Sequence, residues 1–327
     1  MHAMVLEKTG TPLVLREMPD PVPSPGEVRL RVEACGVCRT DLHVMDSELP
    51  DIPLPIIPGH ECIGIVDVLG EGVSTLHTGQ RVGVPWLGGT CQHCEYCRSN
   101  RENLCDTPEF TGYTRPGGYA THLLARADYC VPLSADIDPV AAAPLLCAGL
   151  IGWRCLVKAG KGARLGLYGF GAAGHIVAQI ARRQQREVYA FTRPGDTVAQ
   201  AFATSIGVTW AGSSDVLPPE QLDAAILFAP AGELVPQALR AVKKGGRVVC
   251  GGIHMSDIPS FPYRWLWEER EVVSVANLTR EDARQFFGDG ACRKIKTATH
   301  VYPLQDANEA LSDLRAGLLS GAAVLTP

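Results

Sequence analysis

The chain has 327 residues, of which 46% are apolar and 20% are charged, and its formal net charge is −5. This length usually divides into two domains, and the composition is that of an ordinary globular protein. The negative charge argues against a nucleic-acid or anionic-membrane partner, because both require a basic surface. No apolar run reaches the roughly 18 residues of a membrane span, and the N-terminus lacks the apolar core of a signal peptide, so we expect a cytoplasmic protein.

The first half of the chain predicts a mostly β domain with long functional loops. Val28, Leu30 and Val32 alternate with charged residues, which is the pattern of a half-buried strand. A second apolar run covers residues 63–69 and ends in a glycine-rich turn. Frequent prolines favour loops over helices in this part. We place the domain at residues 1–149.

The pattern changes near Gly149. Short apolar runs predict strands at 164–168, 188–191, 224–228 and 247–250, and helical segments follow up to residue 183, at 198–206 and at 234–242. Strands that alternate with helices indicate βαβ units and a doubly wound parallel sheet of the Rossmann type. We therefore predict an α/β protein with a Rossmann domain at residues 150–288, and a segment 289–327 that returns to the first domain.

Four cysteines lie together in a short polar stretch, separated by two, two and seven residues: Cys91, Cys94, Cys97 and Cys105. Four thiolates complete a tetrahedron around zinc and leave no position open, which is typical of a structural site. An iron–sulfur cluster is the alternative for four sulfur ligands. In a long chain without a signal peptide, the 12 cysteines are better explained as metal ligands and buried small side chains than as disulfides.

A second candidate metal site consists of Cys38, His60 and Cys147. Two thiolates and one imidazole leave the fourth position of zinc open for water or a substrate oxygen, which is the catalytic arrangement. By itself, a histidine is more often a polar core or loop residue, and a single cysteine is usually a buried small side chain. The wide spacing of these residues along the chain does not by itself indicate a metal site.

The stretch after the first strand of the second half carries a G-x-G-x-x-G motif, with alanines at its x-x positions: Gly169, Gly171, Ala172, Ala173 and Gly174. Glycines permit a tight turn and bring a pyrophosphate close to a helix N-terminus. The motif is weak in a chain with 34 glycines, but the predicted strand before it and helix after it favour dinucleotide binding.

The next strand ends in Thr192 and Arg193, where an acidic residue would bind the ribose of NAD. A hydroxyl and a guanidinium can bind a 2′-phosphate, which favours NADP over NAD. The alternative is that Arg193 is a solvated loop residue and Asp196 reaches the ribose.

In combination, these motifs resemble the zinc-dependent alcohol dehydrogenases of the medium-chain dehydrogenase/reductase superfamily. The resemblance covers nearly the whole chain and rests on Gly59-His60-Glu61-x-x-Gly64, on Cys38-x-Thr40-Asp41-x-His43, on the four-cysteine lobe at 91–105 and on the Rossmann glycines. It is strongest for the bacterial and cinnamyl-alcohol-dehydrogenase-like branch. It implies that the first domain is GroES-like.

The resemblance also implies two zinc ions per subunit. Cys38, His60 and Cys147 would hold the catalytic ion, and the lobe cysteines the structural one. Asp41 would orient His60. Glu61 belongs next to the catalytic metal, either as a transient ligand or, as we favour, just outside the ligand set.

The implied reaction interconverts primary alcohols and aldehydes by hydride transfer to and from a nicotinamide cofactor. Thr40 would take the alcohol proton and pass it towards His43, although Thr40 is also a credible helix N-cap. Trp86 would form a wall of the substrate pocket, or belong to the core, and Leu278 would lie near the nicotinamide. We expect a homo-oligomer, a dimer or a tetramer, with no nucleic-acid or membrane partner.

Two features depart from the family pattern. Thr192 replaces the common acid, and the stretch from Gly321 to Leu325 lacks the arginine that contacts the pyrophosphate in many members. Two other readings compete with the dehydrogenase. One is a non-catalytic zinc protein, which the acidic charge disfavours, and the other is a zinc-free enzyme acting on enones, which the intact second metal set disfavours.

Overall fold

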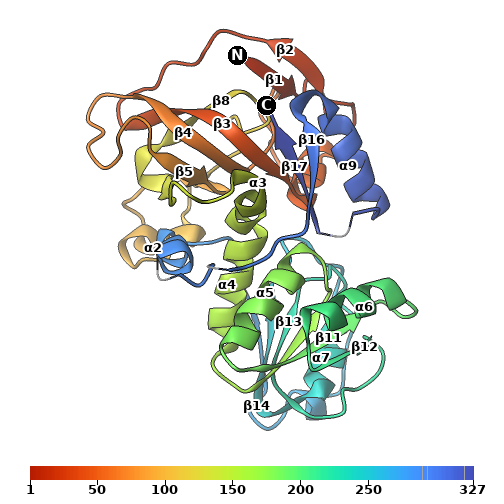
Figure 1. Ribbon diagram of the computed structural model, residues 1–327. Coiled ribbons are helices and arrows are strands. Elements are labelled where there is room, and N and C mark those ends of the chain that lie inside the picture. The colour runs from red at the N-terminus through yellow and green to blue at the C-terminus, as the bar shows by residue number, and fades with distance from the viewer. Residues whose placement is uncertain (289, 293, 320) are drawn as a thin grey trace. The chain divides into compact units, whose positions relative to one another are not determined.

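The computed structural model describes residues 1–288, 290–292, 294–319 and 321–327. The chain divides into two compact units (Figure 1), which we describe separately. The first unit contains Met1–Cys147, Leu278–Gly290 and Lys296–Pro327, and the second contains Ala148–Asn277 and Ala291–Ile295. Within the described residues, no single helix is long and apolar enough to cross a membrane; only the bent pair Pro139–Leu146 and Ala148–Ala159 passes that test of length and composition.

The first unit is built on a sheet in which the described strands follow the order β16-β17-β3-β4-β5-β9, with β8 also paired to β3. Every neighbouring pair is antiparallel except β16 and β17. The long central strand β3 buries Val28, Leu30 and Val32 on one face, as the alternation predicts. The strands are β3 (Glu27–Val37), β4 (Glu61–Leu69), β5 (Arg81–Val84), β8 (His122–Arg126), β9 (Val131–Pro132), β16 (Thr299–Pro303) and β17 (Ala322–Thr326).

Shorter elements surround this sheet. Two small hairpin-like pairs are β1 (His2–Val5) with β2 (Val14–Glu17), and β6 (Leu87–Gly89) with β7 (Glu109–Phe110). The helical elements are α1 (Arg39–Met45), α2 (Glu95–Arg98), η1 (Glu102–Leu104), η2 (Ala127–Tyr129), α3 (Pro139–Ala142), η3 (Ala143–Leu146), η6 (Leu304–Asp306) and α9 (Ala307–Ala316).

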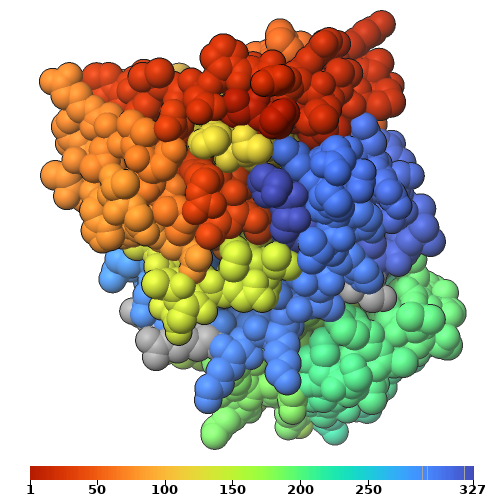
Figure 2. All heavy atoms as spheres, turned by 45° about the horizontal axis from the view of Figure 1, so that its top comes forward, coloured from red at the N-terminus to blue at the C-terminus, as the bar shows by residue number. Residues whose placement is uncertain are grey.

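The C-terminal segment lies beside the N-terminal segment in the first unit (Figure 2). The Asn308 side chain accepts a hydrogen bond from the Leu13 amide and donates one to the Leu13 carbonyl, both at 2.9 Å. Leu304, Ala307 and Leu311 are buried in the same core cluster as β3 and β4. The segment after residue 296 therefore completes the first unit.

The second unit is a Rossmann sheet with strand order β12-β11-β10-β13-β14-β15, and all neighbouring strands are parallel. Its order reverses between β10 and β13, which defines the doubly wound topology. The strands are β10 (Arg164–Tyr168), β11 (Glu187–Thr192), β12 (Trp210–Ser213), β13 (Leu222–Leu227), β14 (Val242–Cys250) and β15 (Glu271–Ser274). The helices are α4 (Ala148–Ala159), α5 (Ala172–Arg183), α6 (Thr197–Ile206), α7 (Leu234–Ala241) and the short η4 (Tyr263–Trp265).

The predicted end of the Rossmann domain at residue 288 differs from the structure, in which Leu278–Gly290 already belongs to the first unit. Helix α8 (Arg280–Ala283) starts there with a capping box between Thr279 and Asp282 and continues as the π-helical turn η5 (Arg284–Gly288). The Arg280 amide donates to the buried Glu102 carboxylate at 2.9 Å. These contacts fix the segment to the first unit. Residue 289, at which we predicted the last segment to begin, lies outside the described residues.

Candidate metal centres and cofactor site

Three separate parts of the first unit bring one cluster of metal-ligating side chains together. Cys38 is the N-cap of α1, directly after β3; His60 directly precedes β4, and Glu61 is the first residue of that strand. Cys147 follows η3. One ligand atom from each of these four residues lies within 4.8 Å of the other three. The pairing of β3 with β4 brings Cys38 and His60 together, although they are distant in sequence.

The geometry of this cluster suits zinc. The Sγ atoms of Cys38 and Cys147 are 3.7 Å apart. A tetrahedral zinc ion with Zn–S bonds of 2.3 Å separates its sulfur ligands by about 3.8 Å. The His60 ring is fully buried, and its Nε2 has no hydrogen-bond partner among the described residues. A buried, unpaired ring nitrogen is costly unless it binds a cation, so the donor set fits the metal.

The charges of the cluster are unevenly distributed. The contact with Cys147 lowers the pKa of Cys38 well below its ordinary value, and the same contact together with burial raises the pKa of Cys147. Burial and the nearby Cys38 raise the pKa of Glu61. The site therefore forms one thiolate readily and releases further protons when a cation enters.

Asp41 holds His60 in place. The imidazole Nδ1 of His60 and a carboxylate oxygen of Asp41 are 3.1 Å apart, and both side chains are buried. Asp41 also accepts hydrogen bonds from the Cys38 amide at 2.8 Å and from the Tyr119 hydroxyl at 3.0 Å. With Nδ1 bonded to a carboxylate, Nε2 is the nitrogen that offers a lone pair to a metal.

Glu61 approaches the cluster across a glycine. Gly36 faces Glu61 in the β3–β4 ladder, and a Cβ atom added to Gly36 would lie 1.8 Å from the Glu61 Oε2. That oxygen is buried, and the part of the chain that the structure describes offers it no hydrogen-bond partner. The structure thus keeps Glu61 among the four clustered ligands, and only a residue without a side chain fits opposite it.

Thr40 and His43 both lie on α1. The alternative of Thr40 as a helix N-cap is wrong, because Cys38 occupies that position and Thr40 belongs to the first turn. The Thr40 hydroxyl is 3.7 Å from the Cys38 Sγ. His43 lies in the last turn of α1, and its Nδ1 forms a hydrogen bond with Glu48.

Trp86 is a buried neighbour of the cluster. Its ring meets the His60 ring edge-on, with centroids 4.9 Å apart, and stacks on Phe110 at 5.1 Å and on Tyr113 at 5.7 Å. The sequence did not single out Phe110 and Tyr113, because nothing in their local pattern links them to residue 86. Their stack makes one side of the metal site aromatic.

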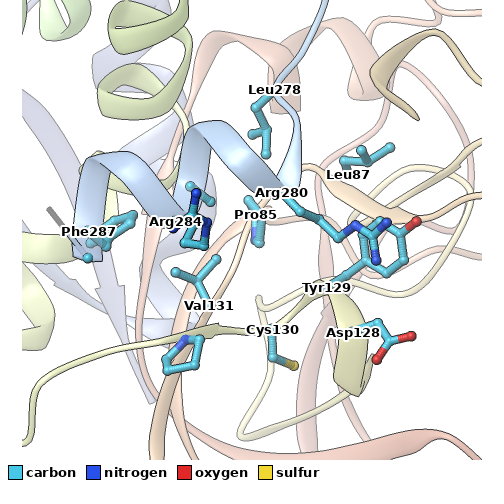
Figure 3. Close-up of a pocket in the computed structure, with 13 residues that line it drawn as sticks. Pro85, Leu87, Asp128, Tyr129, Cys130, Val131, Leu278, Arg280, Arg284 and Phe287 are labelled. Carbon is cyan, nitrogen blue, oxygen red and sulfur yellow. The ribbon is translucent and has the colours of Figure 1, made fainter. Parts of the chain in front are cut away.

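Leu278 lines a cavity of about 350 Å³ in the first unit (Figure 3). Pro85 and Leu87 line it as well, whereas Trp86, which lies between them in sequence, does not. The shared role of Trp86 and Leu278 in one substrate pocket therefore stays a prediction. Arg280 also lines this cavity, and its guanidinium lies over the Tyr129 ring, 5.2 Å from the ring centroid.

The four lobe cysteines form a second cluster whose sulfur atoms lie within 4.8 Å of one another: Cys91, Cys94, Cys97 and Cys105. All four are free thiols. The Sγ of Cys91 accepts from the Cys94 amide, and the Sγ of Cys105 accepts from the Cys91 amide, both at 3.3 Å. Backbone N–H groups of His93 and Cys94 lower the pKa of Cys91 to about 6. These donors favour thiolates, as a cation site requires.

The glycine turn of the second unit lies between β10 and α5. Gly169 has φ +92°, and a Cβ added to Gly174 would lie 2.6 Å from the Gly169 carbonyl oxygen. Glycine is therefore required at both positions for the tight strand-to-helix turn. Gly171 is the N-cap of α5, and Ala172 and Ala173 begin this helix. The amides of this turn can bind a pyrophosphate.

The hydroxyl of Thr192 takes part in hydrogen bonds within the second unit, and its role in cofactor binding stays a prediction. Thr192 is buried at the end of β11 and accepts from the Gln200 side chain at 3.1 Å, while its own hydrogen can reach the Arg193 carbonyl at 3.3 Å. Arg193 is exposed. Asp196 accepts from the Ala199 amide at 2.9 Å and caps α6, so its carboxylate already has a structural role.

The chain is similar to known alcohol dehydrogenases over almost its whole length. Residues 24–135 match the family model described as the alcohol dehydrogenase GroES-like domain. A Mycobacterium tuberculosis protein named "Probable alcohol dehydrogenase AdhA" is 45% identical, with 93% of this chain and 90% of the relative covered. An alcohol dehydrogenase of Geobacillus stearothermophilus is 33% identical, with 99% of each chain covered.

Among solved structures, a thermostable alcohol dehydrogenase from Pyrobaculum aerophilum with cobalt and zinc bound has a TM-score of 0.89 and 27% identity, with 100% of this chain and 99% of that chain covered. The chain therefore belongs to the zinc-type medium-chain alcohol dehydrogenases, with a GroES-like domain and a Rossmann domain. It is an enzyme that interconverts alcohols and aldehydes.

Proposed function

We propose that the protein is a zinc-dependent alcohol dehydrogenase that interconverts primary alcohols and aldehydes and prefers NADP to NAD. The observation that carries the zinc assignment is the buried Nε2 of His60, unpaired and clustered with the sulfur atoms of Cys38 and Cys147. The zinc-bound Pyrobaculum relative supports it.

When bound there, zinc supplies Lewis acidity to the alcohol or aldehyde oxygen. Cys38, His60 and Cys147 hold the ion, and Asp41 fixes the His60 ring that does so. Thr40, next to Cys38, takes the proton of the alcohol, and His43 passes it on towards water. Metal analysis of the purified protein tests the proposal: we expect two zinc ions per chain, one in this cluster and one in the lobe. One ion or none would refute the assignment of both sites.

The cofactor preference rests on the end of β11. Arg193 is exposed and can pair with a 2′-phosphate, whereas Asp196 is engaged as the cap of α6 and does not replace the missing acid. We expect kcat/KM to be higher with NADPH than with NADH. Arg193→Ala should lower kcat/KM with NADPH by about tenfold to a hundredfold, corresponding to roughly 1.5–3 kcal/mol for a hydrogen bond to a charged group, and leave NADH nearly unaffected.

The preference for primary alcohols rests on Trp86. An indole against His60, backed by two stacked rings, leaves little room for a second substituent on the reacting carbon. Trp86→Ala should raise kcat/KM for secondary relative to primary alcohols by about 1–3 kcal/mol per group admitted. Equal efficiency of the parent enzyme on matched primary and secondary alcohols would contradict this part of the proposal.

We also propose a homo-oligomer. The supporting observation is strand β15, which ends the described Rossmann sheet and has mostly exposed side chains. Such an edge offers unpaired backbone groups to a second copy of the chain. Light scattering of the full chain distinguishes a monomer from a dimer or tetramer.

A further inference from the structure

Backbone hydrogen bonds at the C-terminal end of helix α1 hold two polar residues, His43 and Glu48, next to each other. The Glu48 amide donates to the His43 carbonyl at 2.9 Å, and the Ser47 amide donates to the Val44 carbonyl at 3.4 Å. Ser47 has φ +60°, in the left-handed region. These two bonds around one left-handed residue define a Schellman motif, with Asp46 as the C-cap.

In this motif, the side chain of the third-last helical residue contacts the side chain of the second residue after the C-cap. That pair is usually an apolar contact. Here it is His43 and Glu48, and the Glu48 carboxylate forms a hydrogen bond with Nδ1 of the His43 ring. A non-glycine residue at the left-handed position costs about 1 kcal/mol, so the turn is maintained against a local penalty.

We propose that Glu48 is a positioning residue for the proton relay: its carboxylate fixes the tautomer and the orientation of His43. This inference rests on the proposed role of His43 in that relay. A neutral imidazole carries its proton on one nitrogen and accepts on the other. A carboxylate that accepts from Nδ1–H holds the proton there, so Nε2 becomes the nitrogen that receives a proton and returns it to water.

The solvent exposure of the two side chains limits how much their contact stabilises the fold. The Glu48 side chain is 53% exposed and that of His43 is 14% exposed. A pair with one partner so exposed adds only about 0–1 kcal/mol to folding stability. Loss of Glu48 should therefore leave the fold nearly unchanged and act through the His43 ring, which separates positioning from a structural role.

The same helix end offers a matched control. Asp46 pairs with Arg315 of α9, with nitrogen–oxygen distances of 2.8 and 2.9 Å. Asp46→Asn weakens this ion pair two residues away from Glu48 and removes a negative charge from the same turn. The hydrogen bond between Glu48 and Nδ1 of the His43 ring is left in place by this substitution.

The test compares Glu48→Ala, Glu48→Asp and Asp46→Asn in the zinc-loaded full-length enzyme. The first readout is the tautomer of His43 from ¹⁵N spectra of the histidine-labelled protein, with its signal among the 9 histidines assigned by its loss in His43→Ala. We expect the Nδ1–H form in the parent and in Asp46→Asn. In Glu48→Ala we expect a shift towards the Nε2–H form, which Glu48→Asp largely reverses.

The second readout is the single-turnover rate with 1-butanol and the oxidised cofactor. Glu48→Ala should lower the rate at saturating alcohol about tenfold and leave the half-saturating concentration within about twofold, which is part of the roughly 10²–10⁴-fold that a positioned acid–base group contributes. Glu48→Asp should recover most of the rate, and Asp46→Asn should match the parent.

The outcomes separate the inference from the function on which it rests. If His43→Ala lowers the rate but Glu48→Ala keeps both the rate and the tautomer of the parent, Glu48 is not a positioning residue and the relay stands. If His43→Ala itself retains the full rate, the relay through His43 is wrong, and the inference is overturned with it.

Discussion

The two metal-ligating clusters of the first unit are built in opposite ways. The lobe collects all four ligands from one short stretch, residues 91–105, and its sulfur atoms accept hydrogen bonds from the backbone of the same stretch. The other cluster joins Cys38, His60 and Cys147 from three distant segments, and buried side chains support it. A local cluster depends on a short loop, whereas a distributed one depends on the whole sheet.

The difference in burial indicates different tasks. The ligands of the lobe are mostly half-buried and are cysteines only, which suits a closed site. The distributed cluster contains fully buried polar atoms without partners, on His60 and Glu61. Unsatisfied polar atoms are retained where a ligand satisfies them, which supports our proposal that this cluster is the catalytic one. Four substitutions test the contrast.

The largest effect is expected from His60→Ala. Without this ligand the catalytic ion is lost, and Lewis acidity worth several kcal/mol disappears, so kcat/KM should fall by about a thousandfold or more. The lobe should keep its ion, so metal analysis should fall from two to one zinc per chain. Cys130→Ala, which removes a buried cysteine outside both clusters, serves as the control and should retain both ions and activity. Turnover close to that of the parent would contradict the assignment.

Cys94→Ala should have the next largest effect, and on stability rather than on chemistry. A structural zinc site contributes folding free energy directly, so we expect a clearly lower melting temperature and one zinc ion fewer. The rate per zinc-loaded active site should change much less than in His60→Ala. A variant that loses turnover while its melting temperature is unchanged would show that the lobe is not a structural site.

The same contrast explains what the sequence could predict. The lobe cysteines are visible as a local spacing, and the strand Arg164–Tyr168 was predicted with the observed bounds because a buried parallel strand is a short apolar run. The family resemblance predicted the distributed ligands; their spacing did not. Contacts such as Tyr119 with Asp41 have no local signal, since 78 residues separate the partners.

One sequence signal was available but not used. Thr279 and Asp282 have the spacing of a capping box, which marks the start of α8 and thereby the earlier return to the first unit. The non-glycine turn at Ser47 has no such signature, so the pairing of His43 with Glu48 required the backbone hydrogen bonds of the structure. The hydroxyl partners of Thr192, Gln200 and the Arg193 carbonyl, likewise follow from packing and have no local signal.

Gly36→Ala tests how closely Gly36 and Glu61 are packed in the distributed cluster. The new methyl group would overlap with the Glu61 carboxylate, and overpacking in a core costs about 1–3 kcal/mol of stability. Combining it with Glu61→Ala removes most of the overlap, so chemical denaturation of the double variant should show less than the sum of the two single losses. Strict additivity would mean that the two residues do not meet as the structure places them.

Tyr119→Phe should act mainly on stability and have only a small effect on activity. It removes the hydroxyl that donates to Asp41 but leaves the Cys38 amide and the His60 ring bonded to the same carboxylate. The loss of one hydrogen bond to a charged acceptor corresponds to about 1.5–3 kcal/mol of unfolding free energy. Because His60 keeps its Asp41 partner, kcat/KM should fall less than tenfold and both zinc ions should remain. Asp41→Asn, measured alongside, should lower zinc affinity by about 10–100-fold, because it acts on the ligand itself. If Tyr119→Phe reduced zinc affinity as much as Asp41→Asn does, metal binding would depend on the Tyr119 hydroxyl as strongly as on Asp41, which contradicts this prediction.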